Sequence, residues 1–124
     1  MTVVRRADTR RTETPNAVMT TYASPTLGGS TQALWQVEMM PGAAGPRHTM
    51  DVEQVWTVLR GRATVEVSEE AYDLGPGDSI VLAGGVPRRF HADPTHGLTA
   101  LVTGRGAAHA EVPGGATSIP PWIA

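Results

Sequence analysis

Residues 53–61 read Glu-Gln-Val-Trp-Thr-Val-Leu-Arg-Gly, and this stretch decides the fold. Its β-branched and aromatic residues are typical of a β-strand from Gln54 to Arg60. Side chains alternate across a strand, so positions 54, 56 and 58 share one face and 55, 57 and 59 share the other. Both faces carry apolar groups. We therefore expect the strand to be covered on both sides, by a barrel interior on one and by an opposing sheet or a partner subunit on the other.

The rest of the chain repeats this pattern of short apolar runs. Turn-forming residues separate the runs in a chain with 14 glycines and 10 prolines, and no window has a sustained apolar period of 3.6 residues. So many short strands favour a closed barrel or sandwich, because closure removes exposed strand edges. The sequence predicts an all-β, jelly-roll-like barrel in a single domain. The expected strands are 17–22, 31–40, 54–60, 63–67, 71–74, 79–83, 88–92, 98–103 and 107–112.

The two ends of the chain are predicted to be arms around a barrel that occupies residues 31–111. Residues 1–30 would form an N-terminal arm and residues 112–124 a C-terminal arm. The latter contains Trp122 and Ile123, apolar side chains that a free tail does not need. We expect it to pack on the body or across a dimer, and the apolar strand faces favour a homodimer.

Composition excludes several classes of function. The chain has 124 residues, 40% of them hydrophobic, and a net charge of −2, which indicates a packed globule without the basic stripe that nucleic acids require. Its apolar runs fall short of the roughly 20 residues of a membrane span, and anionic membranes would not attract it. The polar N-terminus is not a secretory signal, so we expect a cytoplasmic protein. The absence of cysteine excludes thiolate metal sites, and the absence of lysine excludes Schiff-base chemistry.

The segment 42–61, which includes the expected strand 54–60, resembles the first motif of the cupin superfamily, whose members are small β-barrels. That motif runs Gly, five residues, His, one residue, His, three residues, Glu, six residues, Gly. In this chain the positions fall on Gly42, His48, Met50, Gln54 and Gly61.

The next segment resembles the second motif of the same family. It runs Gly, five residues, Pro, one residue, Gly, two residues, His, three residues, Asn. Here the positions fall on Gly77, Ala83, Gly85, Arg88 and Ala92. The likeness covers about residues 36–103 and implies a cupin-type β-barrel. Of the family's four metal-ligand positions, only His48 keeps its usual residue.

The replacements change the chemistry of the site. A thioether (Met50) is a poor ligand for hard divalent ions, a neutral amide (Gln54) lacks the charge of glutamate, and a guanidinium (Arg88) repels cations. We therefore expect no cofactor. If a divalent metal is bound, its ligands would be His48, Gln54 and His91, although alternation places His91 on the opposite face from Arg88.

The same positions make a plausible pocket for a small organic molecule. His48 would act as general base or acid and Arg88 as the partner of an oxyanion, carboxylate or phosphate. Ligand-binding side chains would be Met50, Gln54, Trp56 and Phe90. Simpler readings stay open: His48 capping a strand end, Arg88 in solvent, Trp56 and Phe90 as plain core, and Glu53 entering the pocket after a one-residue shift.

Three functions follow from these observations. The first is a small-molecule-binding cupin that works as a metal-independent acid/base enzyme, of the isomerase, cyclase or dehydratase type. The second is a non-catalytic ligand-binding or sensor cupin. The third is a metal-dependent oxygenase or isomerase with an irregular ligand set.

Overall fold

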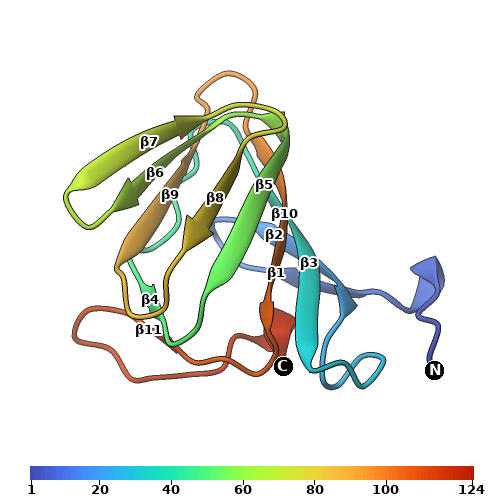
Figure 1. Ribbon diagram of the computed structural model, residues 1–124. Coiled ribbons are helices and arrows are strands. Elements are labelled where there is room, and N and C mark those ends of the chain that lie inside the picture. Colours follow the sequence, from blue (N-terminus) through green and yellow to red (C-terminus); the bar gives the residue numbers. More distant parts are fainter.

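The computed structural model describes residues 1–124 as strands joined by short connections (Figure 1). Neither of its two short 3-10 helices has the length and apolarity that crossing a membrane demands. The strands are β1 Arg10–Glu13, β2 Val18–Ala23, β3 Gln32–Met39, β4 Thr49–Met50, β5 Gln54–Gly61, β6 Ala63–Val67, β7 Glu70–Leu74, β8 Ser79–Leu82, β9 Arg88–Ala92, β10 Leu98–Arg105 and β11 Ala110–Glu111, and the 3-10 helices are η1 Arg6–Asp8 and η2 Pro121–Ile123.

The strands form three antiparallel sheets. The largest has the order β1-β2-β3-β10-β5-β8, a second has the order β7-β6-β9, and β4 pairs with β11. This arrangement confirms the all-β, jelly-roll-like prediction but corrects the closed barrel. Bridges from Ala44 to His91 and from His48 to Arg88 protect the edge of β9, so this edge is covered although the sheets do not close on each other.

The N-terminal segment differs from the arm that we expected over residues 1–30. Its strands β1 and β2 extend the larger sheet, because β2 pairs with β3 along most of its length. The C-terminal segment packs on the body, where Ile123 is buried and Thr21 Oγ1 donates to the Trp122 carbonyl at 2.7 Å. The homodimer and the cytoplasmic location stay predictions.

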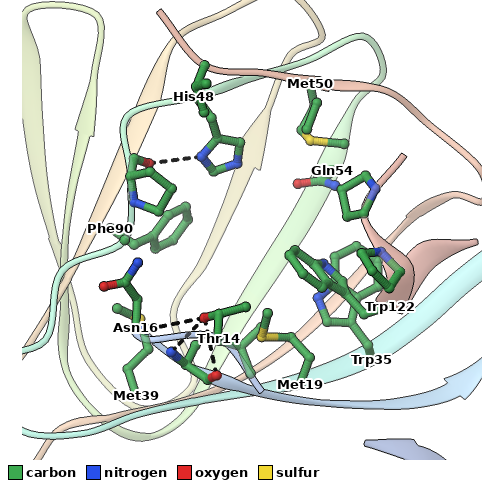
Figure 2. Close-up of a pocket in the computed structure, with 18 of the residues that line it drawn as sticks. Thr14, Asn16, Met19, Trp35, Met39, His48, Met50, Gln54, Phe90 and Trp122 are labelled. Atoms are coloured by element: carbon green, nitrogen blue, oxygen red, sulfur yellow. Dashed lines mark hydrogen bonds between the residues drawn. The ribbon is translucent and has the colours of Figure 1, made fainter. Parts of the chain in front are cut away.

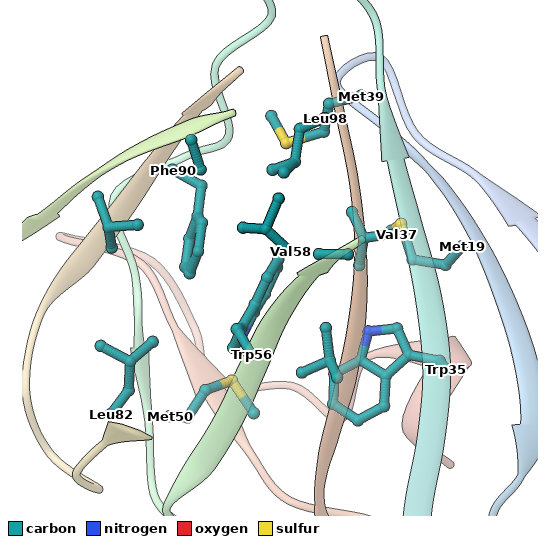
Figure 3. Packing of buried hydrophobic residues seen from close by; sticks show 14 of the residues in the cluster. Met19, Trp35, Val37, Met39, Met50, Trp56, Val58, Leu82, Phe90 and Leu98 are labelled. Carbon is teal, nitrogen blue, oxygen red and sulfur yellow. The ribbon is translucent and has the colours of Figure 1, made fainter. Parts of the chain in front are cut away.

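The core lies between the two larger sheets (Figure 3). In β5 the inward set of Gln54, Trp56 and Val58 is buried as alternation predicts. The opposite face is open in the single chain, where Leu59 is 45% exposed. No other part of this chain therefore provides the cover that we expected on this face of β5.

The end of β5 and the start of β10 approach each other closely at two glycines. Gly61 has φ +72°, and a Cβ built there would collide with the carbonyl oxygen of Gly97. Gly77 also has a positive φ, +87°, but open space surrounds it. Gly61 and Gly77 therefore both need glycine because of their positive φ, but only Gly61 also lacks the space for a Cβ.

We expect Gly61→Ala to destabilise the fold more than Gly77→Ala. Both substitutions carry the cost of a positive φ, and overpacking at Gly61 adds about 1–3 kcal/mol. The difference can be measured as the free energy of unfolding in urea. Equal losses for the two variants would show that the contact between Gly61 and Gly97 does not constrain the fold.

Candidate functional site

A pocket opens between the sheets on the side of β4 and the C-terminal segment (Figure 2). Its volume is about 320 Å³, and 11 of the 20 residues that line it are hydrophobic. Pockets that bind small organic molecules have about this size and character. The structure therefore provides a site for a ligand of modest size.

Five of the residues predicted from the sequence lie together in this pocket. His48, Met50, Gln54, Trp56 and Phe90 all line it. The rings of Trp56 and Phe90 are stacked, with centroids 3.8 Å apart and planes 21° from parallel. The aromatic pair is thus both core and pocket wall, which reconciles the two readings that the sequence left open.

Arg88 lies behind the pocket rather than in its wall. The residue has no exposed surface, and its guanidinium donates to Gln54 Oε1 at 3.2 Å and to the carbonyls of Val86 and Ala83 at 3.1 and 3.3 Å. The direct contact with a ligand expected for Arg88 is corrected accordingly, because the side chain is fully buried and each of its three nitrogens already donates to a neutral acceptor. Burial lowers its pKa to about 10, which leaves it cationic at neutral pH.

His48 is held by its neighbours so that one ring nitrogen faces the pocket. Its backbone makes two hydrogen bonds of 2.9 Å with Arg88, and its Nδ1 lies 3.0 Å from the Pro46 carbonyl. A carbonyl only accepts, so Nδ1 donates, and the neutral ring has its lone pair on Nε2. Burial lowers the pKa of His48 from 6.5, the Pro46 bond opposes this, and the charge of Arg88 lowers it further.

Two hydrogen-bond donors in the pocket region have no partner in the chain. Gln54 contacts Arg88 through its Oε1, and the Nε2 of the same amide makes no hydrogen bond within the chain. The indole Nε1 of Trp56 is buried without a partner. Gly104 lies opposite on β10, where a Cβ would stand 3.1 Å from Gln54 Cγ. A glycine at this position leaves room for the Gln54 side chain.

The side chains around His48 do not fit a tightly held divalent metal. His91 is turned away, with its Nε2 2.7 Å from Glu66 Oε1 in a separate hollow, and Glu53 is exposed outside the pocket. No group of three or more His, Asp or Glu side chains could hold an ion. The remaining candidate donors are His48 and Gln54, whose amide oxygen faces a permanent cation.

Part of the pocket wall was not predicted from the sequence. Thr14 and Asn16, between β1 and β2, and five residues of the C-terminal segment also line it. The apolar end of the chain was the available signal, since it predicted packing on the body. These five residues, all of which follow β11, are Val112, Ser118, Pro120, Pro121 and Trp122.

Comparisons with known proteins agree with this architecture. The profile of the family described as Cupin domain matches residues 35–104. No curated protein matches the chain. Among solved structures, the polyketide cyclase RemF from Streptomyces resistomycificus is similar with a TM-score of 0.70 and 23% identity, over 87% of this chain and 83% of that one.

Two further structures show how widely this fold is used. An RmlC-like cupin from Shewanella frigidimarina NCIMB 400 has a TM-score of 0.67 and 21% identity, over 82% of this chain and 86% of that one. Oxalate decarboxylase from Bacillus subtilis, which has Mn(II) centres, has a TM-score of 0.70 and 19% identity over 82% of this chain. This chain spans only 28% of the length of that enzyme. At these identities the likeness concerns the fold.

The donor set leads to a prediction about metal content. We expect untagged protein, after incubation with divalent ions or Cu(I) and desalting, to contain well below one ion per chain by elemental analysis. His48→Ala provides the control. Near-stoichiometric metal that disappears in His48→Ala would contradict our interpretation of Gln54 and Arg88.

The lowered pKa of His48 links stability to pH. Because its folded-state pKa lies below 6.5, the unfolded chain binds more protons at this site between the two values. The contribution of neutral His48 to the stability of the folded state is complete above pH 6.5 and is lost as the pH falls through its lowered pKa. We expect the free energy of unfolding in urea to fall more steeply over that window than in His48→Gln. Parallel curves for the two proteins would refute the assignment.

Proposed function

Because the chain belongs to the cupin family, we propose that its pocket binds a small, largely apolar molecule that carries oxygen groups, and that His48 transfers a proton on it. The reaction would be an isomerisation, cyclisation or dehydration that needs no metal. The observation that carries this proposal is the placement of an imidazole with a bare Nε2 and an unpaired amide donor, from Gln54, in one apolar pocket.

The polar groups of the pocket suit proton removal next to a carbonyl. His48 Nε2 takes a proton from the carbon, the C–H electron pair forms a C=C bond, and the carbonyl π pair moves to oxygen as an enolate. Gln54 Nε2 is the donor available to that oxygen, and the buried charge of Arg88 favours its negative charge. Return of the proton to another carbon completes an isomerisation, and its transfer to a departing hydroxyl completes a dehydration.

Two features support a base rather than a passive ring at position 48. The lowered pKa keeps His48 neutral, and so able to accept a proton, at neutral pH. The apolar walls exclude water that would otherwise compete for the nitrogen. The likeness to a polyketide cyclase supports a substrate with several oxygen groups.

We expect the protein to accelerate deuterium exchange at the acidic carbon of 2-tetralone in D2O, followed by NMR. His48→Gln should lower this rate by about 100-fold or more, since general-base catalysis contributes that much. The rate should also fall as the pH drops through the lowered pKa of His48, because the protonated ring cannot accept a proton.

Binding of 2-tetralone by calorimetry separates chemistry from recognition. Met50→Leu is the matched control, because it keeps an apolar wall of similar volume and leaves His48 untouched. Tight binding with exchange no faster in wild type than in His48→Gln would reject the catalyst and support the non-catalytic binder.

A further inference from the structure

We infer that the buried pair of Arg88 and Gln54 sets the hydrogen-bond polarity of the pocket, so that the site selects hydroxy ketones over alcohols or hydrocarbons of the same shape. The ketone oxygen would accept from Gln54, and the hydroxyl would donate to His48. The inference rests on the proposed function and names its substrate class. In it Arg88 is a positioning residue that never touches the ligand.

The chemistry of arginine dictates the orientation of the amide. A guanidinium has only donors, so the atom of Gln54 that lies 3.2 Å from Arg88 is the oxygen. The amide nitrogen is the group left for the pocket, and no other hydrogen bond in the chain engages it. Without Arg88 the amide could turn over and present either group, and the selectivity for an acceptor would disappear.

The opposite polarity at His48 is determined in the same way. The Pro46 carbonyl accepts from Nδ1 at 3.0 Å, which leaves Nε2 of the neutral ring as an acceptor. The indole Nε1 of Trp56 is also unpaired, but its burial leaves it out of the groups that would meet the ligand. The pocket therefore offers an acceptor at His48 and a donor at Gln54 (Figure 2).

Arg88 makes a negatively polarised oxygen more favourable at Gln54. None of the ion pairs in the chain includes it, so its charge is balanced by neutral oxygens alone. A buried cation without a counterion attracts electron density in its surroundings. A ketone oxygen that becomes an enolate is stabilised by this field. The oxygen of a hydroxyl directed at Gln54 is less strongly polarised, so it would gain less from the same field.

The substitution Gln54→Glu tests the polarity with the shape unchanged. One carboxylate oxygen would keep the contact to Arg88, and the other would replace the donor with an acceptor. Because the carboxylate balances the buried charge of Arg88, we expect a melting temperature no lower than that of the wild type. Any loss of binding would then not be a loss of folding.

The probes share one two-ring frame, and their dissociation constants are measured by calorimetry in EDTA so that no metal can act through the new carboxylate. They are tetralin, 1-tetralone, 5,6,7,8-tetrahydro-1-naphthol and 5-hydroxy-1-tetralone. In wild type we expect 1-tetralone to bind about tenfold more tightly than tetralin, as one well-placed hydrogen bond provides. Gln54→Glu should remove this advantage and leave the alcohol unchanged or tighter, while Met50→Leu should shift all four probes alike.

The result that would overturn the inference is a Gln54→Glu variant that weakens the ketone and the alcohol equally, or a wild type that binds 1-tetralone no better than tetralin. Either outcome leaves proton transfer by His48 intact. Conversely, reversed selectivity without deuterium exchange would uphold the inference and reject the catalyst. If none of the four probes binds, the pocket itself and this inference are both refuted.

Discussion

The guanidinium of Arg88 is wholly buried beside Gln54, and the candidate site is arranged around this contact. Removing a cation from water costs several kcal/mol unless its donors are satisfied. Here an amide oxygen and two backbone carbonyls accept one hydrogen bond from each of its three nitrogens, which offsets part of this cost. Through its backbone the same residue also pairs with His48. One position thus joins β9, β5 and the segment that carries the imidazole.

The two sheets make this contact possible because they carry its partners separately. Gln54 begins β5 of the larger sheet, whereas Arg88 begins β9 of the smaller one (Figure 1). Their side chains meet in the interior between the sheets, next to the stacked rings of Trp56 and Phe90. The C-terminal segment adds further wall, and its anchoring by Thr21 ties the pocket to β2. The pocket and the stability of the fold therefore depend on the same packed interior.

A permanent cation in this place changes what the cupin scaffold can do. A bound metal contacts a substrate oxygen directly and needs ligands with lone pairs to spare. Arg88 would act indirectly, through the amide of Gln54, and its charge needs no metal-coordinating side chains. In the proposed reaction, this arrangement would keep electrostatic stabilisation of a developing oxyanion and would leave proton transfer to His48. The field is weaker than that of a divalent ion, so the proposed chemistry is limited to carbons that are already acidic.

Local pattern in the sequence determined most of the strands and the face on which Trp56 lies, because alternation and turn residues act between neighbours in the chain. It missed β1 and β4, and the strand expected over 107–112 is limited to Ala110–Glu111. The cupin resemblance, rather than alternation, led to the expectation that His48, Met50, Gln54 and Phe90 lie together, and in the structure all four line one pocket. The tertiary structure alone decided that Arg88 lies behind the wall, that the sheets stay open, and that the C-terminal segment lines the pocket. Those outcomes depend on contacts between residues far apart in sequence, such as Gln54 with Arg88, whose geometry no local pattern contains.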